Sequence, residues 1–312
     1  MVSNRKRDLM IGVGAVVVLM LLPLRLGEYY LYLIRLVGVY VILALGLNVF
    51  MGYAGQINLG SAAFFCIGAY VSTILQIKLG WHYLAGFPIA IALSFLAAWG
   101  MSYPLLRLRG HAMAIGTLAF GIAVFLVAER FRGLTGGEDG VVVPGMALFG
   151  QVMSGTFYYY FILVFVVAAY LFCYFLSDSR IGRALRAIRD NEDAAAAMGV
   201  DVYYYKRLGW LVSGVFGGLA GTLYAQQAGF LSPSTFTLWT NIIVLVMLLV
   251  GGLGLNLGCI VGGTIMTLLP HLIAGMENYV LLLNGLILFT VLRFLPDGIV
   301  GTIANILTRR AG

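Results

Sequence analysis

The stretch LNVFMGYAGQINLGSAAFFCIGAY, Leu47–Tyr70, decides the fold. Apolar sequence surrounds a short segment that contains three glycines and two amides, Gln56 and Asn58. No charged side chain occurs between Arg35 and Lys78. A helix needs about 20 apolar residues to cross the hydrocarbon of a bilayer. The uncharged run therefore predicts two membrane helices on either side of a glycine-rich break.

The composition of the whole chain agrees with a membrane protein. Of its 312 residues 62% are hydrophobic and only 10% are charged, whereas soluble domains carry about 25% charged residues. The net charge of +7 does not indicate a nucleic-acid partner, because the basic residues cluster at the ends of apolar runs, as in loops that set membrane topology. The chain is therefore expected to contact membrane lipid and not nucleic acid. The three cysteines lie in apolar runs and are expected to be buried.

The predicted fold class is all-α, a polytopic transmembrane helix bundle of about ten spans in a single domain over residues 1–312. The first 24 residues have a basic start and a short apolar core but no small-residue cleavage site, so they predict an uncleaved first span. The ten predicted spans are Leu9–Leu24, Leu36–Met51, Ile57–Ile77, Leu84–Leu106, Ala112–Ala128, Phe157–Leu176, Leu208–Ala228, Phe236–Leu253, Leu257–Ile273 and Asn278–Leu292.

The basic residues also predict the orientation of the chain. Loops that face the cytoplasm carry an excess of Lys and Arg. Three basic residues follow Asn4, and alternation through ten spans then places both the N- and C-termini in the cytoplasm. The same alternation places the loop 177–207 inside and the loop 129–156 outside.

Residue types that support catalysis or proton relay are missing from the predicted spans. All twelve acidic residues lie in or beside loops, and the three histidines lie near span ends. The sequence has no H-E-x-x-H, no paired-cysteine motif, no G-x-S-x-G and no phosphate-binding G-x-x-x-x-G-K-[ST]. These absences argue against an intramembrane enzyme, an ion-driven pump, a metal site and a self-contained ATPase.

The basic loop between the sixth and seventh predicted spans is the most informative soluble element. In Ser179–Arg207 the residues Ile181, Leu185 and Ile188 form one apolar stripe at helical spacing. Asp190 or Asn191 can cap a second helix, which Gly199 can end. The loop therefore predicts two short helices with a tight corner. It could lie on anionic lipid or dock into a cytoplasmic partner, and its four successive alanines favour docking.

The outer loop contains LTGGEDGV, Leu134–Val141. Two glycines beside two acids are typical of a tight, solvated turn. The alternative is a contact surface for a partner outside the cell, or a gate. The residues that would form this contact are Thr135, Gly136, Gly137, Glu138 and Asp139.

Several motifs in this order resemble a known family, the inner-membrane permease subunits of bacterial ABC importers for branched-chain amino acids and related small hydrophilic compounds. Within that family the chain is similar to the subunit whose partner is a second, distinct permease. The motifs are Leu47–Tyr70, LRGHAMAIGTLAF (Leu108–Phe120), LTGGEDGV, SRIGRALRAIRDNEDAAAAMGV (Ser179–Val200), GVFGGLAGTLYA (Gly214–Ala225) and GGLGLNLGCIVGG (Gly251–Gly263).

The resemblance implies an assembly in which two permeases form the pathway, two cytoplasmic ATPases bind beneath and a periplasmic binding protein delivers the solute. ATP would bind to the partner subunits, so this chain needs no cofactor of its own. The loop 177–207 would be the site of coupling to the ATPases. Its sequence EDAAAAMG, Glu192–Gly199, resembles the short E-A-A…G signature of importer loops. Asp193 stands between the glutamate and the alanines, so the spacing from Glu192 to the alanines is one residue longer than in that signature. The coupling residues implied are Arg183, Arg186, Arg189, Glu192, Ala195, Ala196 and Gly199.

The glycine-rich break then has two interpretations. Transporters use unwound helices to present carbonyl and amide groups to a solute, and uncharged amides suit a zwitterionic or neutral polar one. The second interpretation is a short cytoplasmic turn between the second and third predicted spans. The Asn-Leu-Gly sequence of the break recurs after Gly254. This similarity is either an internal repeat, as transporters often contain, or a coincidence in glycine-rich sequence. The pathway residues of the first interpretation are Gly52, Tyr53, Gly55, Gln56, Asn58, Ser61 and Asn256.

The function predicted is a permease without catalytic activity of its own, carrying branched-chain amino acids or related small polar solutes. Urea or amide cargo in the same type of importer is an alternative. A stand-alone channel or facilitator for a small neutral solute is another, and it would explain the uncharged spans but not the basic, alanine-rich loop.

Overall fold

The structure is a computed structural model that describes residues 19–20, 22–148, 151–152, 154–272, 285–286, 289–290, 293, 295 and 297–303. Both termini and most of the first and tenth predicted spans lie outside these residues. The α-helices are α2 Glu28–Leu47, α3 Ser61–Leu79, α4 Tyr83–Leu105, α5 His111–Arg130, α6 Arg132–Thr135, α7 Gly155–Asp178, α8 Arg180–Asp190, α9 Glu192–Ala197, α10 Val202–Ala228, α11 Leu238–Gly251 and α12 Asn256–Leu272.

Short elements complete the described fold. The segments η1 Leu22–Leu24, η3 Gly137–Asp139 and η4 Pro233–Phe236 are 3₁₀ helices, and η2 Asn48–Tyr53 is a π-helical continuation of α2. Strand β1 Val141–Val142 pairs antiparallel with β4 Phe230–Leu231, and β2 Ala147–Leu148 pairs antiparallel with β3 Gln151–Val152.

Six of the described helices are long and apolar enough to cross a membrane, namely α2 with η2, α3, α4, α5, α7 and α10. This confirms the prediction of an all-α, polytopic membrane bundle. The eighth predicted span is shorter than expected, since α11 has 14 residues and a length of about 21 Å, against about 30 Å of hydrocarbon. The helix ends at Gly251, because the φ of 117° at the next residue, Gly252, does not continue a helix.

Helix α10 lies at the centre of the bundle and packs against α2, α3 and α4. Its Trp210 is fully buried, donates a hydrogen bond to the carbonyl of Ala98 (2.9 Å) and meets the rings of Phe50 and Phe64 edge-on. Glycines allow α3 and α10 to approach closely, because a Cβ on Gly68 would overlap the backbone of Gly218.

The second predicted span is wrong at its start. It was placed at Leu36, but α2 begins at Glu28, which puts Arg35 two turns inside the helix. The helix can include a charge there because the Arg35 guanidinium donates to the carbonyl of Gly155 and lies beside the Glu28 carboxylate. Tyr29 and Tyr30 are exposed at the helix start, as interfacial aromatics are.

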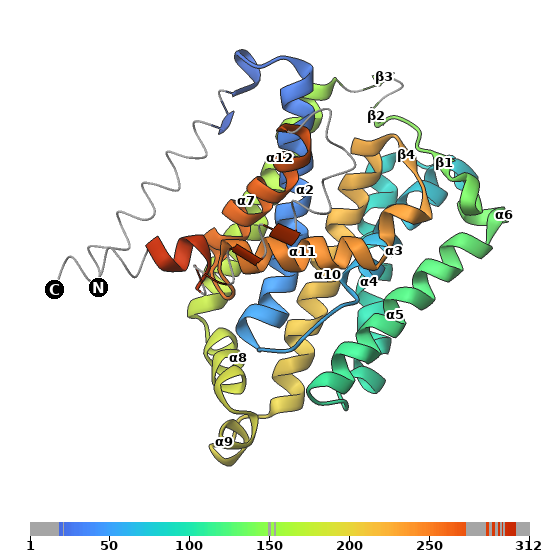
Figure 1. The fold of residues 1–312 in the computed structure, drawn as a ribbon. Helices are drawn as coiled ribbons and strands as arrows, with labels where there is room; N and C mark the ends of the chain where they lie inside the picture. The colour runs from blue at the N-terminus through green and yellow to red at the C-terminus, as the bar shows by residue number, and fades with distance from the viewer. Residues whose placement is uncertain are drawn as a thin grey trace.

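The two ends of the bundle differ in character (Figure 1). Helices α8 and α9 project from one end, and the short strands with α6 lie at the opposite end. Helix α11 crosses the bundle between these ends and contacts α2, α3 and α5. The loop 177–207 and the loop 129–156 therefore lie at opposite ends, as the predicted span order requires.

Candidate functional site

Helices α8 and α9, joined at Asn191, form a bent structure that we call the elbow. Ser179 caps α8 by accepting from the Gly182 N–H (3.2 Å), and Asn191 caps α9 by accepting from the Ala194 N–H (2.9 Å). Gly199 follows α9 with a φ of 82°. The predicted pair of short helices is confirmed, and Asn191 rather than Asp190 is the cap.

The apolar stripe of the elbow faces the protein. Leu185 and Ile188 on α8 are buried, and Ala195 on α9 is buried as well. The other alanines of α9 are exposed, and Met198 at its end is 86% exposed. Helix α9 therefore presents small side chains, the Asp193 carboxylate and, after its last residue, Met198 to its surroundings, and α8 presents its arginines. The larger apolar residues of the elbow pack on the bundle.

The three predicted coupling arginines have different partners. The Arg183 and Arg186 guanidinium groups donate to the carbonyls of Asp178 (2.6 Å) and Ser177 (2.7 Å) at the end of α7. Arg189 instead reaches into the membrane bundle and donates to the carbonyl of Gly52 (2.6 Å). The first two arginines fix the elbow to α7, and the third connects it to the end of η2.

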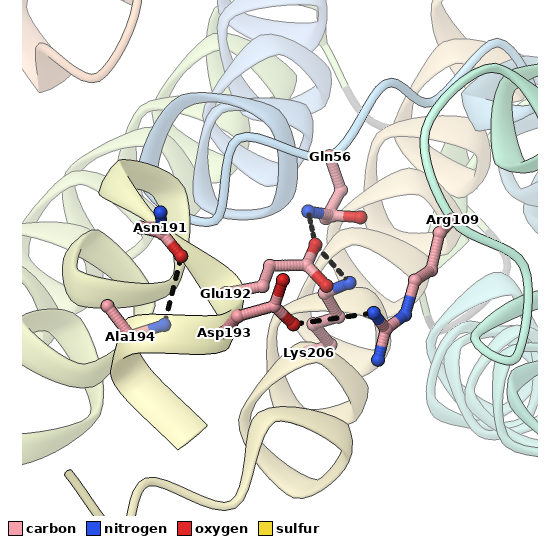
Figure 2. A network of polar contacts seen from close by, with 7 residues as sticks. All are labelled: Gln56, Arg109, Asn191, Glu192, Asp193, Ala194 and Lys206. Carbon is pink, nitrogen blue, oxygen red and sulfur yellow. Dashed lines mark hydrogen bonds and ion pairs between the residues drawn. The ribbon is translucent and has the colours of Figure 1, made fainter. Parts of the chain in front are cut away.

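A second connection joins the elbow to the segment between η2 and α3, residues 54–60, which we call the 54–60 segment (Figure 2). The Glu192 carboxylate accepts a hydrogen bond from the Gln56 amide (2.8 Å) and pairs with the Lys206 ammonium (2.5 Å). The Lys206 side chain is 3% exposed and that of Glu192 is 24% exposed. The neighbouring Asp193–Arg109 pair, at 3.5 Å, is solvent-exposed. Surface pairs of this kind contribute little, whereas a buried charge depends on its partner.

Residues at both ends of η2 contact the turn between α11 and α12. Asn48 accepts from the Gly254 N–H (2.8 Å) and donates to the Asn256 side-chain oxygen (3.4 Å), to which the Tyr53 hydroxyl also donates (2.5 Å). A Cβ on Gly52 would lie 2.7 Å from the Gly254 nitrogen, so only glycine permits this approach. The structure thus brings together Tyr53 and Asn256, which are both predicted pathway residues. Asn48 contacts the same turn, and the sequence analysis did not include it among the pathway residues.

Two further predicted pathway residues, Asn58 and Ser61, lie just before and at the start of α3. Asn58 accepts from the Gly60 N–H (2.8 Å), while its buried amide nitrogen has no partner among the described residues. Asn241 of α11 accepts from both the Ser61 hydroxyl (2.9 Å) and the Ala62 N–H (2.7 Å). Asn241 was not predicted, although an amide inside an apolar run is itself a signal.

Six of the seven predicted pathway residues therefore lie in one stretch of backbone from Gly52 to Ser61, and the seventh, Asn256, meets this stretch from the start of α12. Gln56 faces the elbow, Tyr53 faces the α11–α12 turn, and Asn58 and Ser61 lie at the start of α3. Gly55 has a φ of 68°, and a Cβ there would lie 2.9 Å from the Arg189 Cγ atom. The elbow is packed directly against this backbone.

The predicted outer contact residues form a folded turn at the opposite end. The Thr135 hydroxyl donates to the carbonyl of Ala128 (2.5 Å), and Gly136 and Gly137 both have positive φ. Glu138 and Asp139 are exposed. Pairing of β1 with β4 attaches this turn to the chain that follows α10, so it is an ordered surface with two outward carboxylates.

A membrane bundle with a capped elbow packed on a broken helix has the features of the membrane subunit of a transporter. Among the described residues no three His, Cys, Asp or Glu side chains are placed to hold a metal ion. The sequence profile of the family described as the permease component of branched-chain amino acid transport systems matches residues 29–292, and the chain belongs to this family. It is therefore a multi-pass membrane transport protein and not an enzyme.

Individual relatives agree with the family. The chain is 30% identical over 286 residues to the high-affinity branched-chain amino acid transport system permease protein LivM of Escherichia coli (strain K12), covering 84% of this chain and 67% of the relative. It is 25% identical over 305 residues to LivH of the same organism, with 88% and 98% covered. It is 27% identical over 206 residues to the guanosine ABC transporter permease protein NupQ of Bacillus subtilis (strain 168), with 60% and 63% covered. No solved structure gives a significant match to the chain.

Proposed function

We propose that the chain is the permease subunit of an ABC importer that forms, with a second permease, the pathway for branched-chain amino acids or related small polar solutes. Family membership supports the transport system. The relatives' names support the class of cargo without fixing it, because LivM is described for branched-chain amino acids and NupQ for guanosine. Two separate ATPase subunits and an external binding protein complete the proposed importer.

The proposed topology keeps ten spans, a cytoplasmic elbow and cytoplasmic N- and C-termini. Its support is the distribution of basic residues along the sequence. The turn formed by residues 135–139 would then face the periplasm, where its two exposed carboxylates offer a contact for the binding protein.

The observation that carries the docking proposal is the burial of the elbow's apolar stripe. A hairpin held on lipid would insert Leu185 and Ile188 into the bilayer surface, but these side chains are packed inside the protein. The exposed side of α9 consists of three alanines and the Asp193 carboxylate, and Met198 follows it. Methionine adapts well to apolar partner surfaces. Small side chains bring the helix backbone close to a partner. This surface suits a cleft on a cytoplasmic ATPase.

The contacts of the elbow provide the route by which ATPase movement reaches the pathway. Arg189 holds the carbonyl of Gly52, and Glu192 holds the amide of Gln56. A displacement of the elbow therefore moves the end of η2 and the 54–60 segment that follows it, and with them the α11–α12 turn. We infer that this segment is both the turn at the inner end of the bundle and the lining of the pathway there.

The test uses the complete importer reconstituted in vesicles with R189Q and, as matched control, R180Q on the same helix. Arg180 is exposed and has no hydrogen bond or ion pair among the described residues. R189Q loses a hydrogen bond from a charged donor, a loss of about 1.5–3 kcal/mol. We expect ATP hydrolysis to persist while solute uptake falls about ten-fold or more. R180Q should take up solute normally.

Two results would contradict the proposal. Equal uptake by R189Q and the unaltered chain, at equal incorporation, would remove the Arg189–Gly52 contact from the coupling route. Downhill solute flux through vesicles that contain this chain without ATPase subunits would favour the stand-alone facilitator.

A further inference from the structure

Arg35 is a charged residue inside a membrane helix, and neither the elbow nor the 54–60 segment involves it. It lies in the first half of α2, at the end of the bundle opposite the elbow, and is only 8% exposed. Burying a guanidinium within a membrane span is unfavourable, and such residues usually mark solute or ion sites. The groups around the Arg35 guanidinium are therefore candidates for a binding site.

The described partners of Arg35 leave part of the guanidinium unsatisfied. Its Nη1 donates to the carbonyl of Gly155 (2.6 Å), and its Nη2 lies 3.6 Å from a carboxylate oxygen of Glu28. The Glu28 side chain is 69% exposed, so solvent weakens its interaction with the buried charge. The Arg35 Nε atom is buried and has no hydrogen-bond partner within the described part of the chain.

A cavity of about 170 Å³ opens beside this guanidinium. It is slightly larger than the roughly 150 Å³ cavity that accommodates benzene in an engineered protein, so it fits a molecule of similar size. The residues that line it are Arg35, Gly145, Met146, Gly155, Tyr158, Gln226 and Gln227.

The glutamines that line the cavity have unused acceptors. The Gln226 amide nitrogen donates to the Gln76 side-chain oxygen (3.0 Å), and that of Gln227 donates to the carbonyl of Tyr32 (3.2 Å). Neither glutamine oxygen receives a hydrogen bond from the residues that the structure describes. Met146 is 5% exposed and adds an apolar surface. The cavity thus combines a cationic donor, two neutral acceptors and an apolar wall.

We propose that this cavity binds a small aliphatic zwitterion, with the Arg35 guanidinium holding its carboxylate and the oxygens of Gln226 and Gln227 facing its ammonium group. A fork of N–H donors is the geometry that a carboxylate prefers. A carboxylate ligand also supplies the counter-charge that exposed Glu28 provides poorly. The choice of leucine as the probe rests on the proposed function.

The test is protection of an introduced cysteine in the full-length chain, assembled with its partner permease in nanodiscs. M146C places a thiol in the cavity wall, and the three native cysteines are buried. We expect leucine to slow labelling by a charged thiol reagent. Leucinamide, which lacks the carboxylate, should not protect, and 4-methylpentanoate, which lacks the ammonium group, should protect less. V142C, at a position 71% exposed in β1, is the control and should label at one rate throughout.

Two further variants separate binding from structural support. R35Q and E28Q, each combined with M146C, both break the Arg35–Glu28 ion pair, so a role confined to that ion pair predicts the same result for both. R35Q also removes the hydrogen bond to the Gly155 carbonyl, and the comparison of leucine with leucinamide within each variant distinguishes loss of binding from loss of this support. The proposed site predicts that R35Q raises the leucine concentration for half-protection about 10- to 100-fold, while E28Q leaves it unchanged or lowers it. If R35Q does not fold, the comparison of leucine with leucinamide in M146C alone decides.

Equal protection by leucine and leucinamide, or none by leucine, would overturn the carboxylate site. Equal protection by leucine and 4-methylpentanoate would overturn the assignment of the glutamines. Failure of the proposed function is a separate result, since it would appear as a lack of ATP-driven leucine uptake by the complete importer carrying the unaltered chain.

Discussion

The buried pair between Glu192 and Lys206 gives the sharpest prediction for the elbow. The change E192Q removes the carboxylate and leaves the Lys206 ammonium 3% exposed and without a counter-charge. Removing one partner of a buried pair costs about 3–5 kcal/mol. Because the Glu192 side chain is 24% exposed, the lower figure applies. We therefore expect the equilibrium between docked and undocked elbow to shift by roughly 10²-fold.

Trypsin cleavage of the elbow measures this shift, because its exposed arginines become substrates only when α8 and α9 unfold locally. The cleavage rate follows the population of the open form when closing is fast. In nanodiscs prepared without ATPase subunits, E192Q should be cleaved roughly 10²-fold faster than the unaltered chain. D193N, one position further on, removes a carboxylate from an exposed pair and should change the rate less than about five-fold.

The reverse change should have a smaller effect. K206M leaves Glu192 charged but partly solvated and still bonded to Gln56, so we expect cleavage to rise only about five-fold. The double change E192Q/K206M has no buried unpaired charge and should be cleaved more slowly than E192Q alone. Equal cleavage rates for E192Q and D193N would refute the reasoning. A double variant whose change in the free energy of opening equals the sum of the changes in E192Q and K206M would refute it as well.

Two other predictions concern packing and the η2 contact. G68A should lower the melting temperature and the folded yield of the purified protein, because the added Cβ overlaps the backbone of Gly218. G100A is the control, since nothing lies within 4 Å of a Cβ at that position. It should be neutral or stabilise the protein by up to about 1 kcal/mol. Equal melting temperatures for both changes would contradict this packing. Y53F removes the hydroxyl that donates to Asn256, and a loss of about 1 kcal/mol should appear as a lower urea midpoint, without loss of membrane insertion.

Features that depend on local sequence were predictable. The caps and end of the elbow follow from Asn191 and Gly199, because side-chain capping and positive φ are properties of single residues and their near neighbours. The helical parts of most spans also agree with the apolar runs to within a few residues. Hydrophobic content over about 20 residues determines membrane insertion without reference to partners.

Features that depend on contacts between distant residues were not predictable. The glycine-rich break with Gln56 had two interpretations, a pathway lining and a short cytoplasmic turn, and neither indicated that the Gln56 amide contacts a carboxylate 136 positions away. The start of α2 was misplaced because Arg35 looked like the end of a charge-free run, and the carbonyl that accommodates it lies 120 positions further on. An intramembrane charge or amide signals that a partner exists, and only the fold identifies that partner.

The two similar Asn-Leu-Gly sequences acquire a physical meaning from the fold. Each follows a glycine with positive φ, Gly55 and Gly254, and each leads into a new helix, α3 or α12. The two turns are neighbours, since a Cβ on Gly254 would lie 2.8 Å from Arg189 Nη1 and 3.2 Å from the Gly52 oxygen. A single guanidinium from the elbow thus touches both breaks. Closely packed backbone deforms little, so we infer that the two turns move together when the elbow moves and cannot open independently.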